Sequence, residues 1–486
     1  MNKKYENNQT GLMVACNANN LELVQMILNS KYCSEELLNK QDDNRQTALL
    51  IACSTNNLCL IQMILNSEYC SEELLHKENK NGETVLIYGC IHDVNIVKMI
   101  FESKQFSNNL LIKQNTYIDS TPLMLACHYQ PYVVEYILNS LHCSKDILEQ
   151  HSKYGNILTI ASQYHLSVMQ MILESKYCSY KLFEYQDGID KNNALIDACK
   201  YQPDAVLLLL NSQYCSKEFV NKSNKQNYTS LMIAAQYQPK AFEMILNSQY
   251  CSKELVNKLN NYNQTILAIA CQYQPEVVQM ILESQFCSKE LFNLEDMDND
   301  NNILHIACRY QPDAVKMILN SSFCSEELFN KQNEDRETPL IVACSRQPTI
   351  IQMMLEFEYC SSELLEKQDI NGCNVLTTVC IEHPEYFELI LNSKYCSSEL
   401  FNQQTIYNTN ILLIACEYQP TLVPIILNSK FCSHDLVNKQ NDDSKNALMI
   451  AYENKQLDIV EMIIQSEYCS KELVNELILM ILKAKK

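Results

Sequence analysis

The chain has 486 residues, a net charge of −20 and 47% hydrophobic residues, but only 6 Gly and no Trp. Compact multidomain enzymes need glycine at turns and ligand loops, so this composition argues against that class. The negative charge disfavours nucleic acid and anionic membranes as partners, because both present phosphate groups.

The N-terminal ten residues, MNKKYENNQT, are polar and lack the apolar segment of a secretory signal. No apolar run approaches the roughly 18 residues of a membrane-spanning helix. We therefore expect a cytoplasmic protein, with the cytoplasm of a host cell as the alternative site.

A repeat of 35 to 37 residues, marked by cysteine, runs along the whole chain. The first column of markers is Cys16, Cys53, Cys90, Cys127, Ser162, Cys199, Ala235, Cys271, Cys308, Cys344, Cys380, Cys416 and Tyr452. The second column is Cys33, Cys70, Phe106, Cys143, Cys178, Cys215, Cys251, Cys287, Cys324, Cys360, Cys396, Cys432 and Cys469. Only Cys59 and Cys373 lie outside both columns. The markers define about thirteen units.

Each unit shows the same elements in chain order. A polar stretch such as residues 41–45 precedes an apolar helical pattern such as residues 121–127. A Tyr-Gln-Pro break usually follows, and its proline suits the first turn of a second helix such as residues 275–282. A segment such as residues 69–75 then predicts a short third helical turn, because Ser71 can cap it.

Neither long helix can bury its apolar stripe alone, so stacked copies are expected to share a continuous core. The predicted fold is an all-α solenoid of about thirteen helix pairs with short hairpin or turn fingers. We expect the solenoid to span residues 1–469 and a capping helix to span residues 470–486. In that helix Leu473, Leu477 and Met480 would cover the last apolar face, and Lys483, Lys485 and Lys486 would suit its C-terminus.

The repeat resembles the ankyrin repeat. Residues 37–49 resemble the ankyrin hairpin that runs into a Thr-Pro-Leu-His helix start. Thr-Pro-Leu itself occurs at residues 121–123 and 338–340, and the histidine occurs once, as His305. The units depart from the family by being longer than 33 residues and by having mostly Gln-Pro where the family has Gly-His. The resemblance implies a layered helix-pair stack that binds proteins.

The 24 cysteines do not show metal-ligand spacing, since no Cys-x2-Cys pair occurs. Serine, alanine and phenylalanine replace cysteine in the columns, so we interpret the thiols as small buried apolar groups. We predict no metal and no cofactor. Asp296, Asp298 and Asp300 alternate like the start of a calcium loop but lack its glycine and glutamate, so we interpret them as an acidic hairpin tip. Catalytic motifs are also missing, and we predict that the chain is not an enzyme.

A column of tyrosines ends the first helices, at the position that lies on the concave, ligand-facing surface in ankyrin repeats. Its members are Tyr129, Tyr164, Tyr201, Tyr237, Tyr273, Tyr310 and Tyr418. Tyrosine offers a large rigid face and a hydroxyl, so it is a good anchor for a partner, although it could equally shield the helix ends. The preceding residue varies and includes His128, Lys200, Arg309 and Glu417. We predict that these eleven residues contact partners.

The predicted function is a protein-interaction scaffold that binds partner proteins by its concave face and finger tips. We expect a monomer with no nucleic-acid or membrane partner. The alternatives are a substrate-recruiting adaptor of a ubiquitin ligase and a host-directed effector of the kind found in giant viruses, amoebae and intracellular bacteria.

One proline breaks the repeat pattern. Pro420 opens the second helix of its unit, and Pro424 follows within the same predicted helix. A proline inside a helix removes a backbone hydrogen bond. We therefore predict that this helix either starts late, near Val423, or kinks at Pro424, and that Pro424→Met stabilises the protein.

Overall fold

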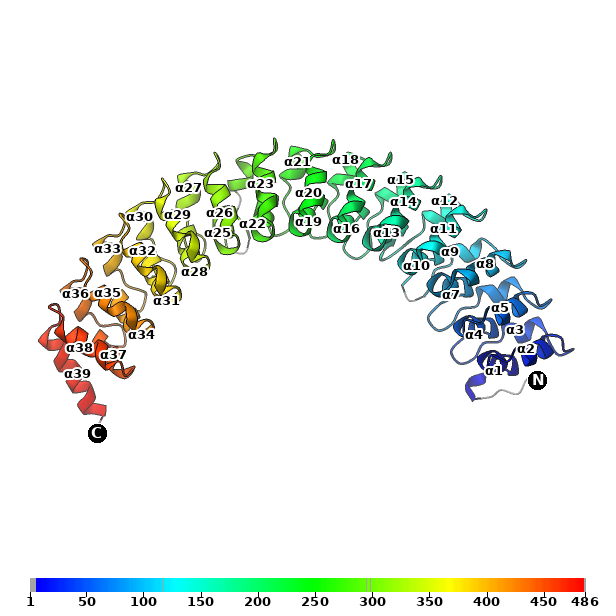
Figure 1. The fold of residues 1–486 in the computed structure, drawn as a ribbon, viewed down its shortest axis with the longest axis horizontal. Helices are drawn as coiled ribbons and strands as arrows, with labels where there is room; N and C mark the ends of the chain where they lie inside the picture. Colours follow the sequence, from blue (N-terminus) through cyan, green and yellow to red (C-terminus); the bar gives the residue numbers. More distant parts are fainter. Residues whose placement is uncertain (1–5, 117, 294, 298, 485–486) are drawn as a thin grey trace. The chain divides into compact units, whose positions relative to one another are not determined.

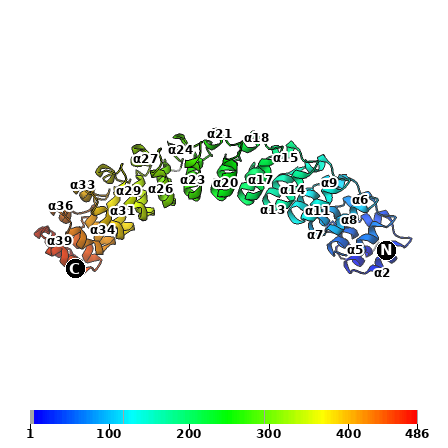
Figure 2. The ribbon, with the colours of Figure 1, turned by 45° about the horizontal axis from the view of Figure 1, so that its top comes forward.

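A computed structural model describes residues 6–116, 118–293, 295–297 and 299–484. The backbone contacts divide the chain into two units, Met1–Leu255 and Val256–Lys486. Each unit consists of antiparallel helix pairs stacked in sequence order, with a short third helix after most pairs (Figures 1 and 2). Described residues of the two units form thirteen such pairs, so the predicted all-α solenoid of helix pairs is confirmed.

Unit 1 contains seven helix pairs. Their first helices are α1 (Gly11–Asn17), α4 (Ala48–Ser54), α7 (Val85–His92), α10 (Pro122–Tyr129), α13 (Ile157–Tyr164), α16 (Ala194–Tyr201) and α19 (Ser230–Tyr237). Their second helices are α2 (Leu21–Leu28), α5 (Leu58–Leu65), α8 (Val94–Glu102), α11 (Pro131–Asn139), α14 (Leu166–Glu174), α17 (Pro203–Asn211) and α20 (Pro239–Leu246).

Shorter elements complete unit 1. The short helices are η1 (Glu6–Asn8), α3 (Glu35–Asn39), α6 (Glu72–His76), α9 (Asn109–Ile112), α12 (Lys145–Leu148), α15 (Tyr180–Glu184) and α18 (Lys217–Asn221), and α21 (Lys253–Val256) reaches the end of the unit. Two antiparallel strands, β1 (His151–Ser152) and β2 (Gly155–Asn156), form one finger, in which Ser152 pairs with Gly155.

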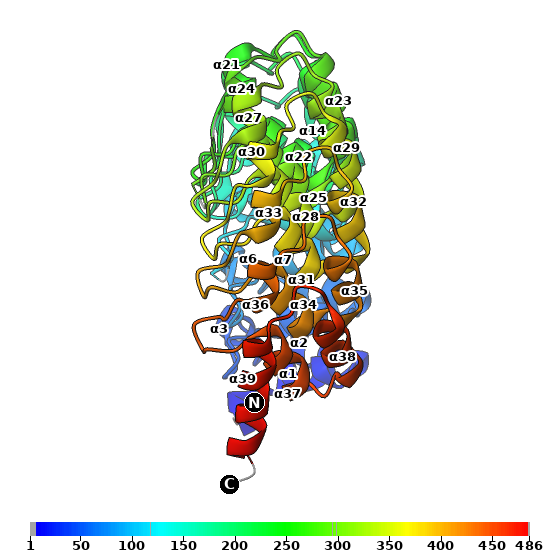
Figure 3. The same cartoon turned by 90° about the vertical axis from the view of Figure 1, so that its left-hand side faces the viewer.

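Unit 2 contains six pairs, and Figure 3 shows their first, second and short helices in three columns. The first helices are α22 (Ile266–Tyr273), α25 (Ile303–Tyr310), α28 (Pro339–Arg346), α31 (Val375–Glu382), α34 (Ile411–Tyr418) and α37 (Ala447–Glu453). The second are α23 (Pro275–Glu283), α26 (Pro312–Leu319), η2 (Pro348–Ile350) with α29 (Ile351–Glu356), η3 (Pro384–Tyr386) with α32 (Phe387–Leu391), η4 (Pro420–Leu422) with α35 (Val423–Leu427), and α38 (Leu457–Gln465). The short helices are α24 (Glu290–Asn293), α27 (Glu326–Asn330), α30 (Ser362–Leu365), α33 (Ser398–Asn402) and α36 (His434–Asn438), and α39 (Lys471–Ala484) follows the last pair.

A threonine or asparagine caps the start of every first helix. Thr121, for example, accepts a hydrogen bond from the backbone N–H of Met124. Where the cap is asparagine, its amide can also donate to the short helix that follows in the chain. Asn193 caps α16 and donates to the backbone oxygen of Phe219 at 3.0 Å. The cap therefore connects the first helix and the short helix of the same repeat.

The core lies between successive pairs, where first helix packs on first helix, as α10 does on α13 and α13 on α16. All first-column cysteines are buried and free, and the second-column cysteines are buried or half-buried and free. Burial raises the pKa of thiols such as Cys199 far above the ordinary value. The prediction that both columns belong to the core is confirmed.

The break between paired helices has a structural purpose that the proline alone does not explain. Gln202, which precedes Pro203, donates from its side chain to the backbone oxygen of Ala161 in the preceding unit. His165 and His383 occupy the equivalent position and contact the backbone oxygens of His128 and Ser345. In these three repeats the side chain before the second helix thus ties the helix pair to the pair before it.

The second helix that contains Pro424 begins its α-helical part at Val423, as predicted, but Pro424 is not the cause. The two preceding second helices also begin with a 3-10 turn, and their α-helical parts start at Ile351 and Phe387 without a second proline. Pro424 aligns with Gln352 and Glu388 rather than with a methionine. It is the second residue of a helix, where a backbone N–H has no helical partner to lose.

The fingers are loops closed by a buried or half-buried polar side chain. In each of these loops a side-chain oxygen accepts backbone N–H groups two to five residues further on; the acceptors are Asp42, Asn79, Asn115, Asp187, Asn224, Asn260, Asp296, Asn333, Asp369 and Asn441. A residue with positive φ follows, as at Arg45 (φ 60°) and Gly372 (φ 77°).

Backbone hydrogen bonds also join successive fingers within each unit. In unit 1 the N–H of Lys225 donates to the backbone oxygen of Asp190 at 2.7 Å. In unit 2 the N–H of Glu334 donates to Asn299 at 3.1 Å. The fingers of each unit therefore form a bonded row beside the first helices.

The last helix, α39, packs against α37 and buries Leu473 and Leu477, while Met480 is half-buried. Lys485, Lys486 and the side chain of Lys483 lie outside the described residues, so their predicted interaction with the helix C-terminus stays a prediction. The division into residues 1–469 and 470–486 also stays a prediction. Throughout the described ranges, no helix has the length and apolar character needed to cross a membrane.

Candidate protein-interaction surface

The predicted tyrosine column lies at the solvent-facing ends of the first helices. Each of its seven tyrosines is the last residue of its helix. Their exposed fractions run from 42% at Tyr237 to 55% at Tyr418. About half of each tyrosine is therefore available to solvent, although most residues of the same helices are buried.

The residue before each tyrosine can contact two rings of the column. The ring of His128 lies edge-on to Tyr129 at 4.3 Å and to Tyr164 of the next unit at 4.1 Å. The ammonium group of Lys200 lies 5.1 Å from the ring centroid of Tyr201 and 5.6 Å from that of Tyr237. The variable position is thus packed between tyrosines and helps to place them.

Arg309 and Glu417 occupy the same position in unit 2 but have charged neighbours. The guanidinium group of Arg309 lies 3.6 Å from the carboxylate of Glu337. The charge of Glu417 raises the pKa of Tyr418. The four variable residues named from the sequence therefore give the column a local charge that changes from repeat to repeat.

A pocket of about 360 Å³ in unit 1 is bounded by the first helices α10, α13 and α16 and by the neighbouring fingers. The tyrosine column supplies Tyr129, Tyr164 and Tyr201 to its lining. The fingers supply Ile118, Tyr154, Ile189 and Asp190, and Asp197 lies at its base together with Leu125 and Ile160. This volume is within the range of pockets that hold a ligand or a side chain.

Asp197 departs from the repeat pattern. The equivalent residues of the other twelve repeats are Val14, Ile51, Tyr88, Leu125, Ile160, Ile233, Ile269, Ile306, Val342, Thr378, Ile414 and Ile450. Asp197 is the only acidic residue in this column and is 1% exposed. Its carboxylate accepts hydrogen bonds from Gln163 at 2.9 Å and Asn192 at 3.2 Å. Burial raises its pKa to about 7, and the charge of Asp187 acts in the same direction.

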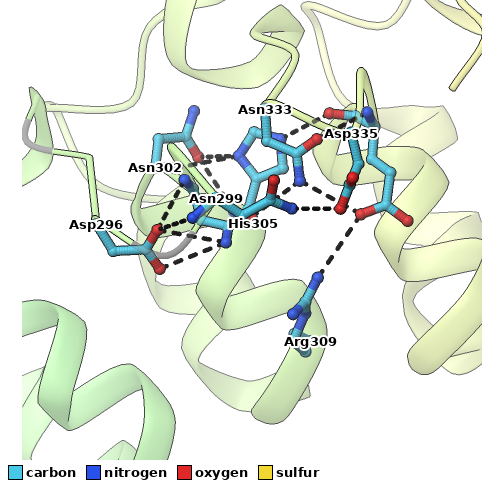
Figure 4. A network of polar contacts seen from close by, with 9 residues as sticks. Asp296, Asn299, Asn302, His305, Arg309, Asn333 and Asp335 are labelled. Atoms are coloured by element: carbon cyan, nitrogen blue, oxygen red, sulfur yellow. Dashed lines mark hydrogen bonds and ion pairs between the residues drawn. The ribbon is translucent and has the colours of Figure 1, made fainter. Parts of the chain in front are cut away.

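A second polar network lies in unit 2 around His305 (Figure 4). The Nε2–H of His305 donates to the backbone oxygen of Glu337 at 3.0 Å, and its Nδ1 accepts the N–H of Asn302 at 3.3 Å. Burial lowers the pKa of His305 to about 4, so the ring is neutral at pH 7. The single Thr-Pro-Leu-His-type histidine therefore links two helix starts and is structural.

A polar pocket of about 430 Å³ adjoins this network and is lined by Arg309, Tyr310, Asn299 and Asp335, among others. Asn299 donates to the carboxylate of Asp335 on the next finger at 2.6 Å. Arg309 and Asp335 both appear beside the network in Figure 4. Two of the predicted partner-binding residues are thus brought to one hollow between first helices and fingers.

The acidic finger of unit 2 has an ordinary loop-closing role. Asp296 occupies the finger column and accepts backbone N–H groups from Asn299 and Asn301. Asp300 has a positive φ of 49°, and Asp298 lies outside the described residues. Within the described segments, no cluster of three His, Cys, Asp or Glu side chains could hold a metal ion.

A family model described as "Ankyrin repeats (3 copies)" matches residues 12–110 and 195–293. The chain is an ankyrin-repeat protein. Ankyrin repeats generally mediate interactions between proteins. The matched segments include the first helices α1 to α7 and α16 to α22 of this ankyrin-repeat protein.

Among solved structures, the ankyrin repeat domain of Bcl-3, described as a unique member of the IkappaB protein family, is similar to part of the chain. The two are 18% identical, with a TM-score of 0.36, over 49% of this ankyrin-repeat protein and 99% of that domain. No curated protein matches the chain.

Sequence reasoning missed two features of the interaction surface of these ankyrin repeats. Asp197 was hidden within a helix, although the repeat alignment alone marks it as an acid in an apolar column. The finger residues Tyr154 and Ile189 are exposed beside the tyrosine column. Their apolar character, in loops that are otherwise polar, was the available signal.

Proposed function

We propose that the chain is a protein-interaction scaffold that binds partner proteins along the tyrosine column and the adjoining fingers. The supporting observation is the row of half-exposed tyrosines, each carried by a rigid buried helix and spaced by the repeat. Rigid aromatic side chains lose little conformational entropy on binding, so they make effective anchors.

The variation of charge along the column favours selective binding of particular partner proteins. His128, Lys200, Arg309 and Glu417 change the character of the column while the tyrosines stay constant. Constant aromatic anchors would supply area, and the variable neighbours would supply selectivity. The roles of a ubiquitin-ligase adaptor and of a host-directed effector stay predictions, as do the cytoplasmic location, the monomeric state and the lack of catalysis.

The proposal is tested by replacing tyrosines inside and outside the column. The test variant carries Tyr129→Ser, Tyr164→Ser and Tyr201→Ser. The control carries Tyr32→Ser, Tyr132→Ser and Tyr180→Ser, which are also exposed residues of unit 1 but lie outside the column. Both full-length variants are first compared by thermal melting, and partner proteins are then captured and quantified by mass spectrometry.

The expected result is that partners captured by the unmodified chain are lost from the test variant and kept by the control. Equal capture by both variants, with unchanged melting, would contradict a role for the column.

A further inference from the structure

The pocket of unit 1 combines three tyrosines of the column with carboxylates. Tyr129, Tyr164 and Tyr201 border it, and Asp187, Asp190 and Asp197 belong to its lining. Among the described residues that line the pocket there is no lysine or arginine. An aromatic and acidic enclosure favours a cation over a neutral or an anionic group.

The tyrosine column already contacts a cation of its own chain next to the pocket. Lys200 places its ammonium group 5.1 Å from the ring centroid of Tyr201. The ring of His128, which borders the pocket, stays neutral at pH 7 because burial and His165 lower its pKa. The existing contacts therefore show the rings in a geometry that accepts positive charge, and His128 adds no opposing charge.

Asp197 places a carboxylate in the lining of the pocket. The equivalent residue is aliphatic in all other repeats except two, which have Tyr88 and Thr378. Asp197 stands between Gln163 and Asn192, which hold its two oxygens in place. Burying a carboxylate costs free energy, so its presence at this single position calls for a compensating partner. A cation that enters the pocket would supply that compensation and would lower the pKa of Asp197.

We propose that this pocket binds the cationic side chain of a lysine or arginine in a partner protein, and this inference rests on the proposed protein-binding function. A long side chain can place its methylene groups against the tyrosine rings while its charged end reaches toward Asp197. A bare metal ion fits the pocket less well, since Asp187 already accepts backbone N–H groups from Ile189, Asp190 and Asn192.

The test uses the full chain labelled with 3-fluorotyrosine, observed by 19F NMR. The probes are acetyl-Gly-Lys-Gly-amide, acetyl-Gly-Arg-Gly-amide and the norleucine peptide, which has the same shape as lysine without the charge. Single Tyr→Phe variants assign the signals of Tyr129, Tyr164 and Tyr201. Asp197→Asn removes the pocket carboxylate, and Asp146→Asn removes an exposed carboxylate of unit 1 elsewhere as the charge-matched control.

The lysine and arginine peptides are expected to shift the three pocket signals, and the norleucine peptide is not. Asp197→Asn should weaken the peptide affinity by about fivefold or more, and Asp146→Asn should leave it unchanged. Equal binding of the norleucine peptide, equal weakening by the two Asn variants, or no shift with any peptide would overturn the inference.

Failure here is distinguishable from failure of the proposed function. If the peptides do not bind but partner capture still depends on the tyrosine column, only the cation pocket is wrong. If capture is also independent of the column, the proposed interaction surface is wrong as well.

Discussion

Gln163 of α13 donates a 2.9 Å hydrogen bond to the buried carboxylate of Asp197 in α16, the next first helix of the stack. This bond crosses from one ankyrin repeat to the next inside the pocket of unit 1. It links the stability of unit 1 to the protonation of one acid.

Replacing Asp197 is predicted to make unit 1 more stable at high pH. Its folded-state pKa of about 7 lies above the ordinary 3.8, so the folded state binds the proton more tightly. The resulting stabilisation is present at low pH and is lost as pH rises through 7. Asp197→Asn should exceed the unmodified chain in unfolding free energy by roughly 2 kcal/mol at pH 8 and by much less at pH 5. Urea unfolding at both pH values measures this, and an identical difference at the two would contradict it.

His305 is predicted to give unit 2 the opposite pH dependence. Its folded-state pKa of about 4 lies below the ordinary 6.5, so the unfolded state takes up the proton first as pH falls. The chain should lose up to about 3 kcal/mol between pH 6.5 and pH 4 from this residue. His305→Thr is a suitable variant, because Thr377 occupies the same position and also completes a capping box. A His305→Thr chain with an unchanged pH profile would show that His305 is not the source.

The cysteines are predicted to differ sharply in reactivity. Cys59 is exposed, whereas first-column thiols such as Cys53 are buried and have a strongly raised pKa. The thiolate is the reactive form, so brief alkylation of the native chain at pH 7.5 should label Cys59 first. Mass spectrometry of tryptic peptides identifies the labelled sites. Rapid labelling of Cys53 and its first-column equivalents would mean that the core is not packed as described.

Pro424→Gln is predicted to change the stability by less than about 1 kcal/mol, because the proline lies in the first turn of α35 and breaks no helical hydrogen bond. Glutamine is chosen because Gln352 occupies the equivalent position two units earlier. This replaces the expectation that Pro424→Met stabilises the protein. Thermal melting of the two chains decides between them, and a gain of about 3 kcal/mol, the cost of an interior proline, would restore the earlier interpretation.

The repeat made much of the fold predictable, because residues at equivalent positions of the repeats have the same structural role. The proline that begins eight of the second helices could be located directly, and the buried cysteine columns followed from their replacements. The contacts between neighbouring repeats were not predicted from the sequence. The reach of Gln202 to Ala161 and the bonds between fingers depend on how far neighbouring repeats are shifted, which the period alone does not specify.

The candidate site was predictable only in part for the same reason. The tyrosines could be recognised from the sequence because they recur in seven repeats. Asp197 occurs in one repeat only, and from the sequence it was one polar residue within a helix. The structure shows that Asp197 lines a pocket together with Leu125 and Ile160 of the two preceding repeats. The sequence does not show that these three residues lie together.

The central claim, that the tyrosine column binds partner proteins, is tested most directly by comparing partner capture with the two triple-serine variants. The account predicts that serine at Tyr129, Tyr164 and Tyr201 abolishes capture, while serine at Tyr32, Tyr132 and Tyr180 preserves it. Capture that survives in the first variant at the level of the second, with both chains fully folded, would contradict the account.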